Sequence, residues 1–211
     1  MVKLTEEQIM EKLERFYEII ETYLPANERT EKLKRFYKDR EITLATSPAS
    51  TKISHHNCFA GGYLDHVIRV TEAALVFDKV WDRFQQKRNH TTEELVFAAL
   101  NHDLGKLGTD AEPFYIPNTS EWHVKNQGKV FNYNPAVTNM DVPDRSLFYL
   151  QQAGIKMSEN EFIAIKIHDG MYSEANRHYL MPPVPEMQLR SNLAYIIHQA
   201  DLMASKVETQ I

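Results

Sequence analysis

Cysteine is almost absent from this chain: Cys58 is the only one among 211 residues. A single thiol cannot form a disulfide within the chain, and it cannot build a site in which several thiolates hold a metal. A metal bound by this chain must therefore take its ligands from histidine and carboxylate side chains.

Long apolar runs and an excess of basic residues are also absent. No stretch approaches the roughly 18 apolar residues that cross a bilayer, and the N-terminus lacks the apolar core of a signal peptide. We therefore expect a cytoplasmic protein without membrane association. With 24 basic and 29 acidic residues the net charge is −5, so no overall positive field attracts nucleic acid, which weakens the case for a long nucleic-acid substrate.

What the sequence does contain is helical periodicity, and we predict an all-α fold. At 211 residues, 43% of them hydrophobic, the chain is long enough for one well-packed domain and an appendage. Capping patterns mark three of the helix starts, at Thr5, Thr91 and Ser158. The predicted helices cover residues 5–24, 28–40, 63–86, 91–103, 145–153, 158–168 and 186–207.

We predict a division into a helical hairpin over residues 1–40 and a main domain over residues 41–211. Residues 11–17 and 31–37 repeat the pattern Glu-Lys-Leu-x-Arg-Phe-Tyr, but two copies are too few for a repeat protein. The two helices either pack as a hairpin on the main domain or provide a dimerisation surface. The sequence therefore leaves open whether the chain forms a homo-oligomer.

Residues 108–145 contain several prolines and aromatic side chains but little periodicity. A loop of this length is uncommon in a compact domain unless it is functional. It is either a lid that stacks on a base or sugar of the substrate, or a loop folded over a small separate core.

A histidine or an aspartate occurs in each of four otherwise apolar helical settings. Burial of a charged or unpaired polar group costs several kcal/mol, so each of these positions needs a partner. Taken alone, each could be an ordinary capping residue or a hydrogen-bonded core histidine. A divalent metal satisfies imidazole and carboxylate together, and the facing helices of a bundle supply such ligands. The residues are His66, His102, Asp103, His168, Asp201 and, near it, His198.

Three motifs give these positions a family resemblance. Residues 54–66 read SHHNCFAGGYLDH, residues 102–106 read HDLGK, and residues 168–170 read HDG. In this order, on helical segments, they resemble the HD-domain superfamily of metal-dependent phosphohydrolases, and in particular its branch with the YhaM-type 3′→5′ exoribonucleases. The resemblance covers roughly residues 47–208 and implies an HD-domain helical bundle with an N-terminal helical extension.

The resemblance implies that His66, His102, Asp103 and Asp201 bind one divalent metal ion. A site of nitrogen and oxygen ligands suits Mn²⁺, Fe²⁺, Co²⁺, Ni²⁺ or Mg²⁺. Such an ion would polarise a phosphoryl oxygen and lower the pKa of bound water. A second metal site stays open, because Asp169 stands where the related exoribonucleases have a second histidine.

Further residues are expected to contact the substrate or to move protons. Asp103 could orient the attacking water, and Asp169 could act as its base. His168 is expected to be either a second-metal ligand or a donor to phosphate, and Lys106 either a phosphate ligand or a solvated lysine at a helix end. The catalytic candidates are thus Asp103, Lys106, His168 and Asp169. The candidates for substrate binding are Lys106, Arg69, Tyr172, Asn176 and Arg177.

The expected function is hydrolysis of a phosphate ester or anhydride in a nucleotide-sized substrate. The small, acidic chain favours a small ligand, as does the absence of the OB domain that precedes the HD domain in the related exoribonucleases. One alternative is a 3′→5′ exonuclease on short RNA or single-stranded DNA, which the likeness of residues 54–66 favours. The other is a non-catalytic nucleotide-binding regulatory module, since a shared fold does not fix function.

Overall fold

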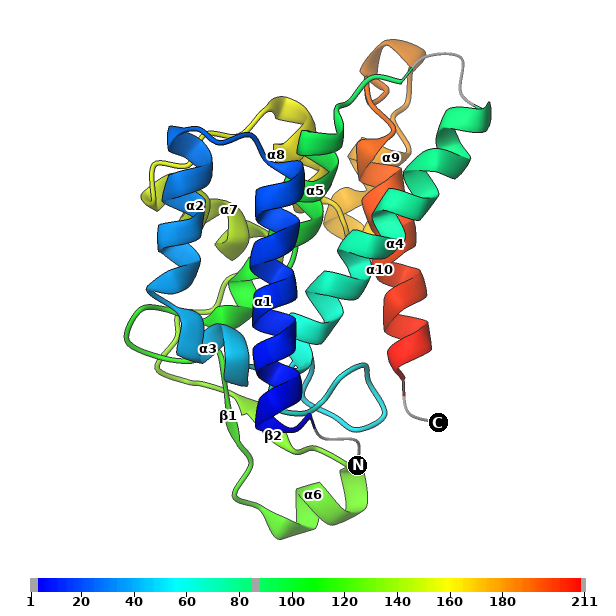
Figure 1. The fold of residues 1–211 in the computed structure, drawn as a ribbon. Coiled ribbons are helices and arrows are strands. Elements are labelled where there is room, and N and C mark those ends of the chain that lie inside the picture. Colours follow the sequence, from blue (N-terminus) through cyan, green and yellow to red (C-terminus); the bar gives the residue numbers. More distant parts are fainter. Residues whose placement is uncertain (1–3, 85–87, 210–211) are drawn as a thin grey trace.

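The computed structural model describes residues 4–84 and 88–209, and nearly all of its regular structure is helical (Figure 1). The predicted all-α fold is confirmed. Two short strands, β1 (Tyr115–Pro117) and β2 (Phe131–Tyr133), form one antiparallel pair. The α-helices of the described residues are α1 (Glu6–Tyr23), α2 (Glu28–Lys38), α3 (Glu41–Thr46), α4 (Gly62–Phe84), α5 (Thr92–Asn101), α6 (Glu121–Gln127), α7 (Val142–Gln152), α8 (Glu159–Lys166), α9 (Arg177–Leu180) and α10 (Leu193–Glu208). Short 3₁₀ turns are η1 (Leu104–Leu107), η2 (Gly170–Tyr172), η3 (Glu174–Asn176) and η4 (Pro185–Met187).

Three helices begin where the sequence predicts, because capping boxes fix their first turns. In α1 the Thr5 hydroxyl accepts the Gln8 N–H at 3.2 Å, and the Gln8 side chain accepts the Thr5 N–H at 2.9 Å. The same reciprocal pair starts α5 at Thr91 and α8 at Ser158. Each box satisfies two backbone donors that a helix start otherwise leaves without partners.

The centre of the molecule is formed by α4, α5, α8 and α10. Helix α4 packs against α5 and α10, and α8 packs against the same two helices, as Figure 1 shows for α4 and α10. Their facing sides belong to one continuous apolar core, which includes Leu64, Val67, Leu100, Ile165 and Ile197. Polar side chains on the inner faces of these helices are therefore brought into contact with one another.

The two N-terminal helices share this core. Leu13 and Phe16 of α1 and Leu33 of α2 are buried in the same apolar cluster as α4 and α5. Tyr37 at the end of α2 donates a hydrogen bond toward the Leu100 carbonyl at 3.1 Å and the Asn101 side chain at 2.8 Å. The hairpin thus holds the last turn of α5 in place, while the division at residue 40 stays a prediction.

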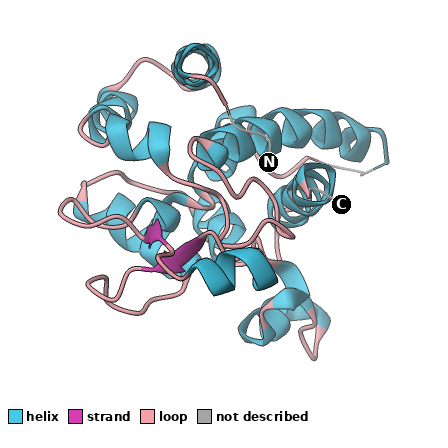
Figure 2. Cartoon of the chain, turned by 90° about the horizontal axis from the view of Figure 1, so that it is seen from below, coloured by secondary structure: helices cyan, strands magenta, loops and turns pink. Residues whose placement is uncertain are grey.

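Residues 108–145 are more structured than their sequence suggests. They contain β1, α6 and β2, which project at the lower end of the molecule in Figure 1. Figure 2 shows the strand pair from below, beside helices of the main body. Phe114, Tyr115 and Val137 form a small buried cluster of their own, so this segment folds over a separate core. Helix α6 has no buried residue.

The predicted start of the last helix, at residue 186, is wrong: α10 begins at Leu193. In place of the predicted first turn, Pro185–Met187 form the 3₁₀ turn η4, which begins at the last of three prolines within residues 182–185. The Ser191 hydroxyl also accepts the Leu193 N–H at 3.1 Å, which competes with helical bonding.

Other predicted helix limits also differ from the structure. The helix predicted over residues 158–168 ends at Lys166, so His168 and Asp169 lie in the turn that follows it. The helix predicted from residue 145 begins at Val142, with a proline in its first turn. The helix predicted over residues 63–86 reaches Phe84, and residues 85–86 lie outside the described residues. None of the described helices has the length and apolar character that crossing a membrane requires.

Candidate metal centre

The structure brings the four predicted metal ligands together at the centre of the bundle. His66 projects from the first part of α4, His102 and Asp103 directly follow α5, and Asp201 is carried by α10. The first three side chains are buried, and Asp201 is partly exposed. One group of ligands is thus assembled from three helices that pack on each other.

The turn after α5 is held against α7 by a glycine and a serine. A Cβ on Gly105 would lie 2.3 Å from the Val142 carbonyl oxygen, so only glycine fits this approach. The Gly105 N–H donates to the Ser146 hydroxyl at 2.8 Å, and that hydroxyl donates to the His102 carbonyl at 3.1 Å. These contacts explain why the HDLGK motif carries glycine at this position, and they orient Asp103 toward the centre.

The donor atoms of the four side chains lie close to one another. The shortest separation joins His66 Nε2 and Asp201 Oδ1, at 3.1 Å, and the two Nε2 atoms of His66 and His102 are 3.4 Å apart. Asp103 Oδ2 lies 3.5 Å from each of these Nε2 atoms, and His102 Nε2 lies 3.9 Å from Asp201 Oδ1. Each of the two histidines therefore faces the other and both carboxylates.

The hydrogen bond made by the outer ring nitrogen, Nδ1, determines which nitrogen of each neutral histidine carries the hydrogen. The inward nitrogen, Nε2, then has the lone pair. Nδ1 of His102 and of His168 contacts the backbone carbonyl three residues earlier, at 2.7 and 2.8 Å. A carbonyl can only accept, so Nδ1 carries the hydrogen and the neutral ring keeps its lone pair on Nε2. His66 Nδ1 likewise faces the Glu208 carboxylate, at 2.9 Å.

Buried charges shift several pKa values at the centre. Burial by itself disfavours the charged form of each group. Hydrogen bonds to Asp103, Asp201 and Glu208 nevertheless raise the pKa of His66 well above its ordinary value. Attraction by Lys106 lowers the pKa of Asp103 well below its usual range, and His66 lowers that of Asp201. The carboxylates are therefore ionised and favour positive charge beside them.

This arrangement fits the donor set of a divalent metal. Ligand atoms lie about 2.0–2.2 Å from such an ion, so two donors of one ion are separated by about 3 Å when adjacent and about 4.2 Å when opposite. The separations of 3.1 to 3.9 Å fall within this range. Within the cluster, His66, His102 and Asp201 form a group that could hold a metal ion, and His102 and Asp103 form another with His168. A further group that could do so consists of His168, Asp169 and Asp201.

Arg69 lies behind the centre and pairs with acidic side chains there. Its Nη1 contacts Glu208 Oε1 at 2.6 Å and Asp65 Oδ2 at 3.2 Å. The other oxygen of Glu208 contacts His66. Arg69 therefore pairs with the carboxylate that contacts His66, one of the predicted metal ligands. It does not line the cavities described next.

Two adjoining cavities open from the centre, with volumes of about 310 and 390 Å³. Both are lined by Asp103, Lys106, Asp169 and Tyr172. Burial opposes the charge of Lys106, but Asp103, 2.6 Å away, raises the pKa of that amine above its ordinary value. Lys106 is thus a cation in the wall of the cavity, although it is also paired.

The remaining residues predicted to bind substrate differ in their positions relative to the two cavities. Tyr172 is 77% exposed at the mouth of both cavities. Asn176 is buried and lines the smaller cavity, where its amide donates to the Gly170 carbonyl at 2.9 Å. Arg177 is exposed at the start of α9 and lines neither cavity.

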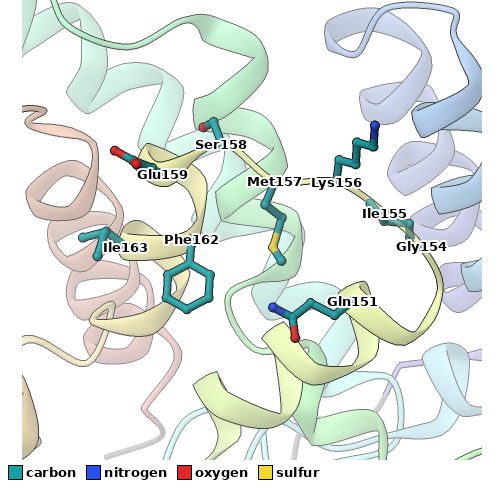
Figure 3. Close-up of a pocket in the computed structure, with 9 residues that line it drawn as sticks. All are labelled: Gln151, Gly154, Ile155, Lys156, Met157, Ser158, Glu159, Phe162 and Ile163. Carbon is teal, nitrogen blue, oxygen red and sulfur yellow. The ribbon is translucent and has the colours of Figure 1, made fainter.

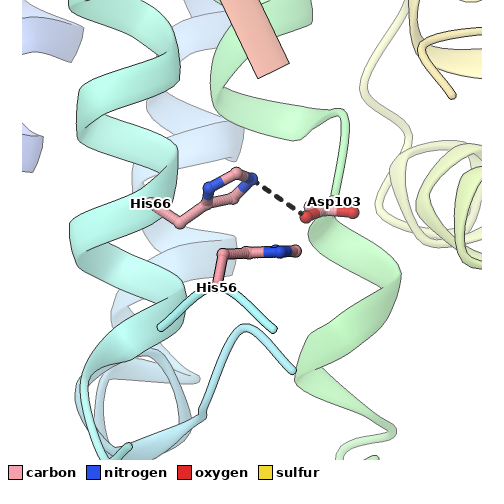
Figure 4. Close-up of side chains that lie close together, drawn as sticks. All are labelled: His56, His66 and Asp103. Carbon is pink, nitrogen blue, oxygen red and sulfur yellow. Dashed lines mark ion pairs between the residues drawn. The ribbon is translucent and has the colours of Figure 1, made fainter. Parts of the chain in front are cut away.

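Three residues near the centre were not among the predicted site residues. His56 lies beside His66, with ring centroids 4.6 Å apart (Figure 4). Burial lowers the pKa of His56 to about 2, aided by nearby Lys106. Its place beside the Gly-Gly motif was the signal that could have found it. Glu208 and Lys206 gave no comparable signal, because a charged residue near a helix end is usually solvated.

His198 supports the turn that carries His168. Its Nδ1 lies 2.7 Å from the His168 carbonyl oxygen. A Cβ on Gly170, whose φ is +57°, would lie 2.3 Å from the His198 ring. The glycine after His168 and Asp169 is therefore required both by the backbone conformation and by this close approach.

A larger cavity of about 720 Å³ lies elsewhere, between the end of α7 and α8 (Figure 3). Its walls are formed by Met157, Phe162 and Ile163, with Lys156 and Glu159 at its edge. It contains none of the histidines and aspartates described above, so its size alone does not make it the chemical site.

No protein-family model, no curated protein and no solved structure matches this chain. The interpretation of the centre therefore rests on its own residues and their geometry.

Proposed function

We propose that this chain is an HD-type, metal-dependent phosphohydrolase that acts on a nucleotide-sized substrate. One observation carries the proposal: the inward nitrogens of His66 and His102 converge with the carboxylates of Asp103 and Asp201 beside a cavity that is also lined by the partly buried Lys106. The order of these residues in the chain matches the motifs that resemble the HD superfamily.

The residues proposed to hold the ion are His66, His102, Asp103 and Asp201. When bound there, a divalent ion supplies Lewis acidity to a phosphoryl oxygen and lowers the pKa of water. Glu208 accepts the outer N–H of His66, so the neutral ring, which is the form that binds a metal, has its lone pair on the inward nitrogen.

Lysines at the cavity are proposed to bind the phosphate of the substrate. Lys106 is 13% exposed and stays charged, so a phosphate oxygen could replace part of its contact with Asp103. Lys166 lines the smaller cavity, and Lys206 lines the larger one. Each cavity thus has two lysines in its wall, which suits an anionic group of the substrate.

His168 and Asp169 are proposed to move protons. Burial alone would lower the pKa of His168, but Asp103 and Asp169 raise it to about 9. His168 is thus protonated near neutral pH and could donate a proton to the oxygen of the leaving group. Asp169 is half-exposed, and its Oδ1 lies 3.6 Å from His168 Nε2, where it could accept a proton from water.

The size of the cavities and the exposed Tyr172 support a small substrate with an aromatic base. Cavities of 310 and 390 Å³ fall within the range of small-molecule sites. Tyr172 is free to stack on a base at the entrance. No overall positive charge accompanies the site, since the chain carries a net charge of −5, and this favours a nucleotide over a polymer.

The first test combines metal analysis with phosphate release from a panel of mono-, di- and triphosphates in the presence of Mn²⁺, Co²⁺ or Mg²⁺. His102→Ala and Asp103→Asn should each lower turnover at least about 100-fold, since loss of the ion removes several kcal/mol of transition-state stabilisation. His123→Ala, on the exposed face of α6, is the matched control and should behave like the wild type.

Different outcomes separate the alternatives. Turnover like that of the wild type in either ligand variant would refute the metal assignment. Metal binding with release only from short oligonucleotides, and with binding that weakens steeply as salt rises, would identify an exonuclease. Nucleotide binding without any hydrolysis would identify a regulatory module.

A further inference from the structure

His56 lies in a loop before α4 whose backbone is fixed on both sides. The Ser50 hydroxyl donates to the His56 carbonyl at 2.7 Å, and His56 forms an isolated antiparallel bridge with Thr209, which follows α10. The next residue, Asn57, donates from its side chain to Asp65 Oδ2 at 2.8 Å. The loop therefore connects the start of α4 with the end of α10 and holds the His56 ring in one place.

A close approach fixes the turn between this loop and α4. A Cβ on Gly62 would lie 2.1 Å from the Asn57 carbonyl oxygen, and Asn57 itself has a φ of 42°. The chain adopts a conformation here that asparagine tolerates better than most residues. This turn brings His56 back against the helix that carries His66.

One nitrogen of the His56 ring is left without a partner by the described part of the protein. Its Nε2 is buried and has no hydrogen-bond partner among the described residues. Buried polar atoms normally have partners, and an exception indicates either a missing ligand or a water. Apolar residues would fill the same space without this cost.

Ligand atoms surround the ring. A nitrogen of His56, one of His66 and an oxygen of Asp103 all lie within 4.8 Å of one another. Figure 4 shows the His56 ring beneath that of His66, extending toward Asp103. Opposite donors of one ion are about 4.2 Å apart, so these three atoms are within reach of a single ion after small side-chain adjustments.

We infer that His56 is a further ligand of the proposed metal ion, through a ring nitrogen. The inference rests on the proposed metal centre and extends its ligands from four residues to five. Three imidazoles and two carboxylates make a set richer in nitrogen than Mg²⁺ prefers, and they favour a transition metal such as Fe²⁺, Co²⁺ or Ni²⁺. The loop before α4 is then part of the centre.

The test measures metal binding rather than turnover. Full-length His56→Ala and wild type are titrated with one equivalent of Co²⁺, the visible absorption spectrum is recorded, and the affinity is obtained by competition with a chromophoric chelator. His55→Ala is the matched control, because His55 is exposed and lines the same cavity. His102→Ala shows the effect of losing one of the four proposed ligands.

We expect His56→Ala to bind Co²⁺ at least about tenfold more weakly than wild type and to change its spectrum, since even outer residues of metal sites contribute this much. His55→Ala should match wild type in both measurements. Circular dichroism of the metal-free variants checks that they are folded. If His56→Ala fails to fold, His56→Gln, which keeps a polar side chain of similar length, provides the same comparison.

Two results would overturn the inference in distinguishable ways. If His102→Ala loses Co²⁺ binding while His56→Ala keeps wild-type affinity and spectrum, His56 is not a ligand but the metal centre stands. If the wild type binds no Co²⁺, Mn²⁺ or Ni²⁺, the metal centre and the ligand role of His56 both fail.

Discussion

Individual histidines in this protein are oriented by the group that accepts hydrogen from their outer nitrogen. For His102 and His168 this group is a backbone carbonyl, and for His66 it is the carboxylate of Glu208. Only the carboxylate adds negative charge, which makes the imidazole a stronger ligand. Glu208 is therefore the outer residue whose change should affect a bound metal most.

The variant Glu208→Gln tests this role. Glutamine can still accept the His66 N–H but lacks the charge, and it also leaves Arg69 without one of its partners. We expect metal affinity to fall by about 10- to 100-fold with little change in helical content. The measurement is chelator competition, with the exposed Glu186→Gln as control. Unchanged affinity would mean that Glu208 serves folding alone.

Among individual site residues, the sequence predicted some and missed others for a physical reason. A polar residue within an apolar helix, such as Asp201, is conspicuous because its burial is costly. Arg69 and Glu208 both resemble solvated residues in the sequence, and only the packing of α4 on α10 shows that they pair with each other. His56 lies in a loop, where periodicity gives no information about burial.

Helix ends, rather than helix centres, carry several of the candidate site residues of this molecule. The HDLGK motif begins where α5 ends, and His168 and Asp169 follow α8. The starts of both helices were predictable, because Ser, Thr and Glu form capping boxes by local spacing. Their ends were less predictable, because they depend on long-range contacts such as that from Tyr37 to the last turn of α5.

The variant Tyr37→Phe tests whether α2 holds the end of α5. Loss of the hydroxyl leaves the Leu100 carbonyl and the Asn101 side chain short of a buried donor, which costs about 1–3 kcal/mol. We expect the free energy of unfolding in urea to fall by this amount. Tyr133→Phe is the control and should leave stability unchanged, because the Tyr133 side chain on β2 is exposed. An equal effect of both variants would contradict this role of Tyr37.

For the whole molecule, the proposed metal centre would join α4, α5 and α10, so metal binding and folding stability should be linked. A ligand present at 100 times its dissociation constant stabilises the folded state by about 2.7 kcal/mol. Chelation should remove this gain and lower the melting temperature. A metal ion that raises the melting temperature must bind the folded state more tightly than the unfolded chain.

The pH dependence should have opposite signs with and without metal. His168, whose pKa is raised from 6.5 to about 9, stabilises the metal-free fold in its protonated form. That contribution is present below about pH 6.5 and is lost as pH rises toward 9. Metal instead requires neutral imidazoles and displaces their protons, so its stabilising effect should grow over the same range. Thermal melts at several pH values, with metal and with chelator, measure both trends; parallel curves would contradict this linkage.

The contact between His66 and Glu208 spans 142 positions of the chain, and this distance has a consequence for biosynthesis. While the ribosome is still translating the segment before α10, His66, His102 and Asp103 have neither Asp201 nor Glu208 beside them. The nascent chain can therefore offer a metal only an incomplete set of ligands, and tight capture has to wait until α10 has emerged and docked. Metal loading would then report that the chain has been translated at least through residue 208.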